Sequence, residues 1–356
     1  MSKDDIVIGV VGIDHRHIYG MLEGMLSEGA TCKGWWTEGE PQTIEGFVKR
    51  FGEIPRVEDR ESLLKDPDID MILIASPPHE RADRSVEAME NGKDVMLDKP
   101  GCVKLSELER IEETVARTKR IWSIDFSERF EVPAAYKALE IVRTGVLGRI
   151  VQTVSVGPHR LNAPTRPDWF FDKSLYGGIL GDIGTHQIDQ FLAFTGSTEA
   201  EIVSSTIGNF ANEDHPDFED FGEVLLRSEH AQGYFRVDWY TPDALPNWGD
   251  GRLFVLGTNG YIELRKYVDV EGRPGTDHLF MVTNDESKYI DCADVERTYF
   301  SDLKRDVIDR TEHAASFEHT ATVMRLALQA QAEAHVRWGH GIRGRSEPLR
   351  VRARVR

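Results

Sequence analysis

A glycine-rich segment at residues 176–189 contains side chains of the kinds that transfer protons. Its sequence, YGGILGDIGTHQID, places Asp182 four residues before His186, the spacing at which two side chains share one face of a helix. A nearby carboxylate orients an imidazole and raises its basicity, and the ordinary pKa of histidine lies near neutral pH. The segment therefore predicts an acid–base pair. The alternative is that Asp182 only caps a helix and His186 lies on the surface.

Lys99 is a second candidate, in the sequence Asp98-Lys99-Pro100 that ends an apolar run at 94–97. If this run is a parallel strand, Lys99 lies at the carboxyl edge of the sheet, where open α/β sheets bind ligands. Pro100 fixes the direction in which the chain leaves the strand. Without that context, a solvated lysine is the alternative.

The first strand leads into the loop Gly9-Val-Val-Gly12-Ile13-Asp14-His15-Arg16-His17. A dinucleotide-binding fold has G-x-G-x-x-G/A here, but Asp14 stands at the second glycine and His17 at the third small residue. An aspartate facing pyrophosphate would repel it, whereas the helix N-terminus, His15 and Arg16 would attract it. His15 and His17 could also bind a metal, but we favour a cofactor-facing role and predict no metal site.

Other expected cofactor contacts lie at the ends of the next strands. Thr37 and Glu38 follow the second strand, where an acidic residue binds ribose. Because no Arg or Lys is next to them in the sequence, we expect NAD rather than NADP, without excluding NADP. The full set of predicted cofactor-binding residues is Gly12, Ile13, Asp14, His15, Arg16, Thr37, Glu38, Ser76, Pro77, His79, Asp98 and Lys99.

Two domains must position these residues. The chain has 356 residues, and residues 1–126 alternate short apolar strands with helical patterns. This alternation predicts an α/β Rossmann domain with a doubly wound parallel sheet. Residues 127–336 read as consecutive strands with few helices, which predicts an α+β domain with an open, mostly antiparallel sheet. The six strands expected there are 149–157, 200–210, 219–227, 232–240, 252–257 and 260–265.

Composition limits the possible partners. The 61 acidic and 43 basic residues give a net charge of −18, which disfavours nucleic acid as a partner. No apolar run approaches the ~18 residues of a membrane helix, so we expect no membrane partner. The three cysteines form no disulfide or metal motif, and we expect a cytoplasmic protein.

The last twenty residues, 337–356, differ from the rest. They contain seven arginines and one glutamate, and from Leu349 onward apolar residues alternate with arginines. Alternation with period two is typical of a strand. We predict a C-terminal arm that contacts the acidic surface of its own or a neighbouring subunit, with a frayed terminus as the alternative.

Taken together, these motifs resemble the Gfo/Idh/MocA oxidoreductase family, which includes glucose–fructose oxidoreductase and inositol dehydrogenases. Residues 92–100, GKDVMLDKP, are similar to the family's G-K-x-V-x-x-E-K-P, with Asp98 in place of Glu. Residues 177–189 are similar to its G-G-x-L-x-D-x-G-x-H-x-x-D. Ser76-Pro77, Arg129-Phe130 and the stretch 145–150 are further matches.

The resemblance implies an NAD(P)-dependent dehydrogenase that forms a homodimer or homotetramer through the sheet of its second domain. It also implies that Lys99, Asp182 and His186 surround the reacting substrate carbon. We expect His186 to be the general base, Asp182 to bind a hydroxyl or hold the imidazole, and Lys99 to stabilise negative charge on oxygen.

The segment 157–171 is the least typical of the family and is expected to line the substrate pocket. Aromatic and polar side chains suit a sugar, a polyol such as inositol, or a glycoside, and Trp239 and Trp248 could contribute from the sheet. Two alternatives stay open: a redox-assisted lyase or glycosidase that recycles NAD, and a non-catalytic dinucleotide-binding sensor. The predicted substrate-binding residues are His159, Arg160, Asn162, Trp169, Asp182 and His186.

Overall fold

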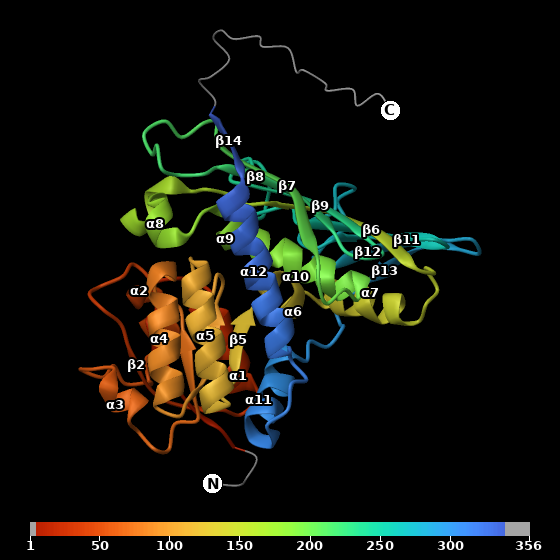
Figure 1. The fold of residues 1–356 in the computed structure, drawn as a ribbon. Helices are drawn as coiled ribbons and strands as arrows, with labels where there is room; N and C mark the ends of the chain where they lie inside the picture. The colour runs from red at the N-terminus through yellow and green to blue at the C-terminus, as the bar shows by residue number, and fades with distance from the viewer. Residues whose placement is uncertain (1–4, 339–356) are drawn as a thin grey trace, which may run out of the picture.

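The computed structural model describes residues 5–338 and contains two sheets (Figure 1). The first has five strands in the order β2-β1-β3-β4-β5, and every adjacent pair is parallel. Every residue of β1, β3, β4 and β5 is buried, as expected for a parallel sheet covered on both faces. The strands are β1 Val7–Val11, β2 Thr31–Trp36, β3 Met71–Ile74, β4 Asp94–Asp98 and β5 Trp122–Asp125.

Helices alternate with these strands along the chain, which confirms the predicted Rossmann domain. They are α1 Ile18–Ser27, α2 Ile44–Phe51, α3 Glu61–Leu64, α4 Pro78–Glu90 and α5 Leu105–Thr118. Their apolar faces are inserted into the core, as for Met21, Leu22 and Met25 of α1, all of which are fully buried. The carboxyl ends of β1, β3 and β4 consequently lie side by side and present Gly12, Ser76 and Lys99 at one edge.

The second sheet has nine strands in the order β13-β12-β11-β10-β6-β9-β8-β7-β14. The pairs β6–β9 and β7–β14 are parallel and the other six pairs are antiparallel, so the predicted mostly antiparallel sheet is confirmed. The strands are β6 Ile150–Pro158, β7 Glu201–Asn209, β8 Phe221–Arg227, β9 Gln232–Asp238, β10 Arg252–Gly257, β11 Gly260–Arg265, β12 His278–Thr283, β13 Ser287–Asp291 and β14 His335–Trp338.

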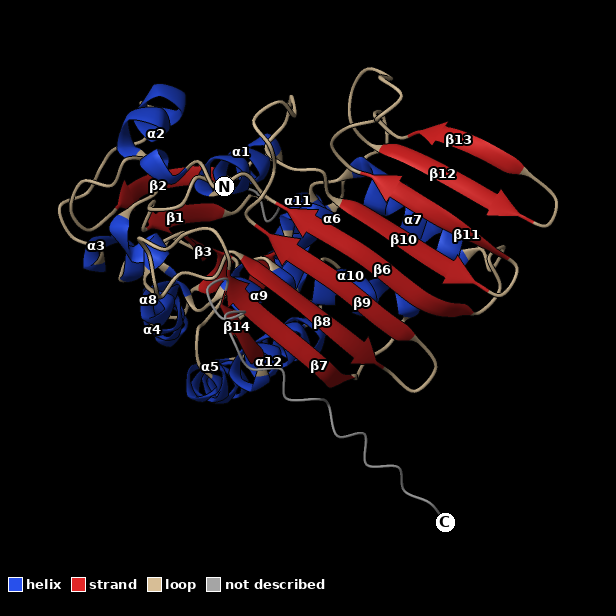
Figure 2. Cartoon of the chain, turned by 90° about the horizontal axis from the view of Figure 1, so that it is seen from above, coloured by secondary structure: helices blue, strands red, loops and turns tan. Residues whose placement is uncertain are grey.

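Most helices of the second half lie on one face of the nine-stranded sheet, the face toward the Rossmann domain (Figures 1 and 2). Helix α11 (Tyr299–Asp309) instead packs against α1 of the Rossmann domain (Figure 1). Helix α12 also runs alongside α5, so it packs against both sheets (Figure 1). No helix within residues 5–338 covers the other face. The helices are α6 Ser127–Phe130, α7 Pro133–Arg143, α8 Lys173–Tyr176, α9 Ile179–Asp182, α10 Gly184–Thr195, α11 Tyr299–Asp309 and α12 Phe317–Glu333.

Some details differ from the sequence prediction. The hairpin β12–β13 was not predicted, and the single helix expected at about 180–195 is two helices, α9 and α10, that meet at Ile183. Arg337, assigned to the arginine-rich arm, lies in β14, and residues 339–356 of that arm fall outside the described residues. No helix within 5–338 is both long and apolar enough to cross a membrane.

Candidate active site

A cavity of about 830 Å³ lies where the Rossmann domain meets the second domain. From the Rossmann side, residues 14–17, residues 40–43, Glu38 and Lys99 line it. From the other side, the predicted lining residues His159, Arg160, Asn162, Trp169, Asp182, Trp239 and Trp248 contribute, together with Thr165, Arg166, Pro167, Asp168 and Phe170. The structure therefore brings five of the six predicted substrate residues and five of the twelve predicted cofactor residues around one space.

Lys99 and Asp182 meet across this cavity. Lys99 follows the carboxyl end of β4, Asp182 ends α9, and Lys99 Nζ donates to Asp182 Oδ1 at 2.5 Å. Both residues are buried. Burial alone would raise the pKa of Asp182, but the lysine ammonium holds it below its ordinary value. The pair thus combines an ammonium group and an ionised carboxylate in a space that excludes most water.

His186 lies deeper than predicted. The break at Ile183 places it on α10, and it is 1% exposed and is not among the residues that line the cavity. Burial lowers its pKa to about 3, although the nearby Glu128 carboxylate opposes this shift. The ring is therefore neutral at physiological pH. Its Nδ1 has no hydrogen-bond partner within residues 5–338, which is unusual for a buried polar atom.

Glu128, on α6, is a buried acid that the sequence analysis did not identify. Lys266 Nζ donates to Glu128 Oε2 at 2.8 Å, and Gln187 Nε2 donates to the same oxygen at 2.9 Å. Burial would raise the pKa of Glu128, but Lys266, His186 and His159 lower it well below its usual value. An anionic carboxylate thus lies near two histidines of the site. Only the neighbouring Arg129-Phe130 pair had drawn attention to α6.

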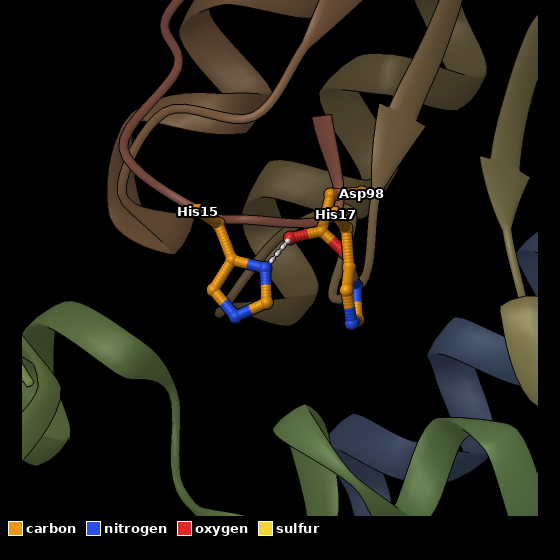
Figure 3. A group of neighbouring side chains, drawn as sticks. All are labelled: His15, His17 and Asp98. Atoms are coloured by element: carbon orange, nitrogen blue, oxygen red, sulfur yellow. Dashed lines mark hydrogen bonds and ion pairs between the residues drawn. The ribbon is translucent and has the colours of Figure 1, made fainter. Parts of the chain in front are cut away.

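Asp98 organises the Rossmann edge of the cavity (Figure 3). His17 Nδ1 lies 2.7 Å from Asp98 Oδ1, and His15 Nδ1 lies 2.9 Å from Oδ2. The buried Arg81 donates to Oδ2 at 2.8 Å. Despite its burial, Arg81 and the two neighbouring imidazoles hold the pKa of Asp98 well below its ordinary value. Because an ionised carboxylate only accepts, His17 Nδ1 carries the proton.

The same three residues are the one group within 5–338 whose spacing could suit a metal ion, since their ligand atoms lie within 4.8 Å of one another. Arg81 already supplies a positive charge to the carboxylate. Burial lowers the pKa of His15 to about 4, with Asp98 opposing the shift, so this ring is neutral without a metal. We interpret the cluster as a means of orienting two imidazoles toward the cavity; the absence of a metal stays a prediction.

The loop after β1 has a shape that suits a dinucleotide. Gly12 has φ +82°, and a Cβ there would lie 2.6 Å from the Cβ of Ser76, so only glycine allows β1 and β3 to turn this closely together. The Ile13 amide donates to Thr37 Oγ1 at 3.4 Å. Burial, reinforced by Glu80, raises the pKa of Asp14 to about 6. Asp14 can therefore become neutral beside a phosphate, and the loop fits the cofactor.

The expected ribose-binding region contains a residue that sequence adjacency could not reveal. Arg84 of α4 lies 3.2 Å from Glu38 and 3.3 Å from Glu80, and its guanidinium lies over the ring of Trp36. The prediction that no basic side chain lies beside Glu38 is therefore wrong. It holds for the neighbours of Glu38 in the sequence but not for its neighbours in the folded chain. Both of these carboxylates already neutralise Arg84, which keeps the preference for NAD reasonable.

The remaining predicted contacts support the loop from beneath or beside it. Pro77 precedes the first turn of α4, which contains His79. Ser76 is buried against Gly12. Neither Pro77 nor His79 lines the cavity, so they shape the edge of the sheet rather than face the enclosed space.

Comparison with known proteins identifies the family. Residues 7–126 match the profile of an oxidoreductase family with an NAD-binding Rossmann fold, and residues 136–263 match the GFO/IDH/MocA C-terminal domain. A solved structure from Erwinia carotovora atroseptica, described as an oxidoreductase, is 40% identical with a TM-score of 0.90, covering 93% of this chain and 99% of that one. The chain belongs to the Gfo/Idh/MocA family.

Several Gfo/Idh/MocA relatives have named substrates. The scyllo-inositol 2-dehydrogenase (NAD(+)) of Bacillus subtilis is 27% identical over 263 residues, or 72% of each chain. Levoglucosan dehydrogenase of Pseudarthrobacter phenanthrenivorans is 32% identical over 171 residues, 46% of this chain and 42% of that protein; the match therefore spans under half of this relative. A levoglucosan dehydrogenase structure with NADH and levoglucosan shares the fold at 20% identity, with a TM-score of 0.75 and coverage of 93% and 97%.

Membership of the Gfo/Idh/MocA family confirms the predicted family, the fold class, the oxidoreductase class and the nicotinamide dinucleotide cofactor. The roles of individual residues and the domain boundaries at 126 and 336 stay predictions.

Proposed function

We propose that this protein is an NAD(P)-dependent dehydrogenase that removes a hydride from a secondary hydroxyl of a sugar, a polyol such as an inositol, or a glycoside. The Lys99–Asp182 pair carries this proposal, because it places an ammonium and a carboxylate at the carboxyl edge of a Rossmann sheet inside the interdomain cavity. The named relatives that act on scyllo-inositol and levoglucosan support the substrate class.

In this proposal the loop Gly12–Arg16 and Glu38 hold the dinucleotide, which supplies a hydride acceptor when bound. Lys99 donates to the reacting oxygen and stabilises negative charge that develops there. Asp182 orients that ammonium and binds an adjacent hydroxyl. Trp239 and Trp248 contact the C–H faces of the substrate ring, while His159 and Asn162 bind hydroxyl groups.

His186 is the proposed general base. Burial keeps its imidazole neutral at physiological pH but lowers its basicity, contrary to the expectation that Asp182 would raise it. The ring can still accept a proton, since its Nδ1 has no partner within residues 5–338. It lies in the electrostatic field of both Lys99 and Glu128, and Glu128 favours the protonated form that the ring reaches after accepting the hydroxyl proton. The depth of His186 requires the substrate to reach beyond the Lys99–Asp182 pair.

An assay of inositols, hexoses and glycosides with NAD⁺ and with NADP⁺ tests the function. We expect absorbance of the reduced cofactor to rise with at least one polyol or sugar, and NAD⁺ to be preferred. Consumption of a glycoside without net NADH would instead identify the redox-assisted lyase or glycosidase. Binding of NADH without turnover of any substrate would identify a sensor.

A further inference from the structure

Arg166 is a cation of the cavity wall that none of the predicted roles uses. It lies in the loop between β6 and α8 and lines the cavity. Its guanidinium lies 4.6 Å from the ring centroid of Phe170 and 5.0 Å from that of Trp239. Nε donates to the carbonyl of Leu161 at 2.9 Å, and Nη2 donates to the carbonyl of Arg160 at 3.3 Å. These contacts fix the plane of the guanidinium.

Arg166 has no carboxylate partner within residues 5–338. The nearby Asp182 is bound to Lys99, and the exposed Asp168, two residues along the chain, forms no ion pair with it. Arg160, the neighbouring cation, is different: it donates to the carbonyls of Pro242 and Leu245 and lies 3.6 Å from a carboxylate oxygen of Asp243. Arg166 is thus the uncompensated guanidinium of this wall.

The surroundings of Arg166 disfavour its charge. Burial lowers its pKa, Asp182 on the same side of the cavity opposes this shift, and Arg16 adds to it. A desolvated cation gains most from an anion that supplies both charge and hydrogen-bond acceptors. The protein has a net charge of −18, yet none of the carboxylates within residues 5–338 forms an ion pair with Arg166.

We propose that the substrate is a sugar acid, such as a uronate, and that Arg166 binds its carboxylate. This inference rests on the proposed function and narrows its substrate class. A guanidinium matches the planar, two-oxygen geometry of a carboxylate, and Nη1 makes no hydrogen bond within the described chain. A phosphate fits less well, because its second negative charge would meet Asp168 and Asp182. Arg16, the other guanidinium on the cavity without an ion pair in residues 5–338, is assigned to the cofactor loop.

Matched pairs of substrates test the proposal: glucose with glucuronate, galactose with galacturonate, and mannose with mannuronate. Glucose 6-phosphate is added to test whether the site prefers a phosphate to a carboxylate. The proteins are the wild type, Arg166→Gln, Arg166→Lys, and Arg305→Gln as a control for loss of an exposed arginine on α11. Thermal unfolding checks that each variant is folded. Calorimetry in the presence of saturating NADH measures binding independently of turnover.

We expect one acid to be oxidised with a kcat/KM about 10- to 100-fold above that of its neutral partner, the range of one charge-assisted hydrogen-bonded contact. Arg166→Gln should remove this preference while changing the neutral substrate little. Arg166→Lys should restore part of it, and Arg305→Gln should leave it intact. The acid should also bind to the wild type and not to Arg166→Gln in calorimetry.

Three outcomes would overturn the inference. Neutral sugars could be oxidised as well as the acids, Arg166→Gln could weaken both members of a pair equally, or glucose 6-phosphate could be preferred over every uronate. In each case the dehydrogenase function stands. A fourth outcome is that a uronate binds in an Arg166-dependent manner but is not turned over. That result would support the sugar-acid site and contradict the dehydrogenase proposal. Absence of both binding and turnover overturns both.

Discussion

Asp14 occupies the position of the second glycine in the dinucleotide fingerprint, and its protonation should control cofactor affinity. Its pKa is raised to about 6, so the carboxyl is mostly neutral below pH 6 and anionic above it. The anion repels pyrophosphate by about 1 kcal/mol in a water-like dielectric and by more when desolvated. NADH affinity should therefore fall as the pH rises through about 6.

Fluorescence titration of NADH between pH 5 and pH 8 measures this dependence. Asp14→Asn keeps the shape of the side chain and removes its charge, and Asp14→Gly restores the fingerprint. Both variants should bind NADH more tightly than the wild type at pH 8 and should lose the dependence near pH 6. A wild-type slope in Asp14→Asn would mean that the carboxyl points away from the phosphates.

His186, the proposed general base, is 1% exposed and lies below the cavity surface. If His186 is the general base, the substitution His186→Ala should lower kcat by about 10²–10⁴-fold. NADH affinity should hardly change, since the proposed role of the ring is toward the substrate rather than the nucleotide. Lys99→Ala is the comparison variant, and it should lower kcat and also weaken cofactor binding. Near-normal turnover in His186→Ala combined with complete loss in Lys99→Ala would transfer the role of base to Lys99.

A buried carboxylate connects three parts of the second domain, through one ion pair and one hydrogen bond. Glu128 on α6 binds Lys266, which follows β11, and Gln187 on α10. Lys266 and Glu128 are 1% and 3% exposed. Burial of two charges is costly, but removal of only one partner leaves the other uncompensated.

Lys266→Met and Glu128→Gln should each lower the free energy of unfolding, by about 3–5 kcal/mol where the remaining charge stays buried. The double variant should lose less than the sum of the two single losses, because neither charge is left unpaired. Denaturant unfolding of the four proteins measures this coupling. Additive losses would mean that the two residues stabilise the domain independently.

The sequence predicted the elements well where a local pattern carries the information. Strands buried on both faces, such as β1 and β3, have continuous apolar sequences, and Lys99 directly follows a strand as expected. Asp182 ends α9, whereas it was expected inside a single helix at about 180–195. The break between α9 and α10 was not predicted, although Gly181 and Gly184 lie on either side of Ile183 and glycine is a poor helix former. Arg84 and Glu128 were missed because each acts on a residue distant in sequence, and no spacing rule reports such contacts.

At the scale of the whole molecule, one face of the nine-stranded sheet is left without helices (Figure 2). Five neighbouring strands, β9, β6, β10, β11 and β12, align one row of cross-strand partners on this face. In strand order these partners are Tyr234, Val154, Phe254, Glu263 and Phe280. Phe254 also stacks on Tyr261 at 5.0 Å. Aromatic side chains on an open sheet face are typical of a surface that another subunit covers.

We therefore expect a homodimer or homotetramer in solution, assembled through this face. Phe254→Glu places a charge at its centre and should convert the oligomer to a folded monomer, because an unpaired charge in an interface is costly. Val270→Glu adds the same charge in a loop where the side chain is 72% exposed, and it should leave the assembly unchanged. Light scattering gives the mass and circular dichroism confirms folding.

Truncation after residue 336 tests whether the arginine-rich arm contributes to this assembly. Seven arginines against one glutamate in residues 337–356 complement the acidic remainder of the chain, and surface charge attraction of this kind weakens with salt. The 1–336 protein should therefore dissociate at a higher protein concentration than the full chain, and the difference should shrink as salt is added. An oligomer of equal strength with and without the arm would restrict assembly to the sheet face. A full-length protein of monomeric mass would contradict both contacts at once.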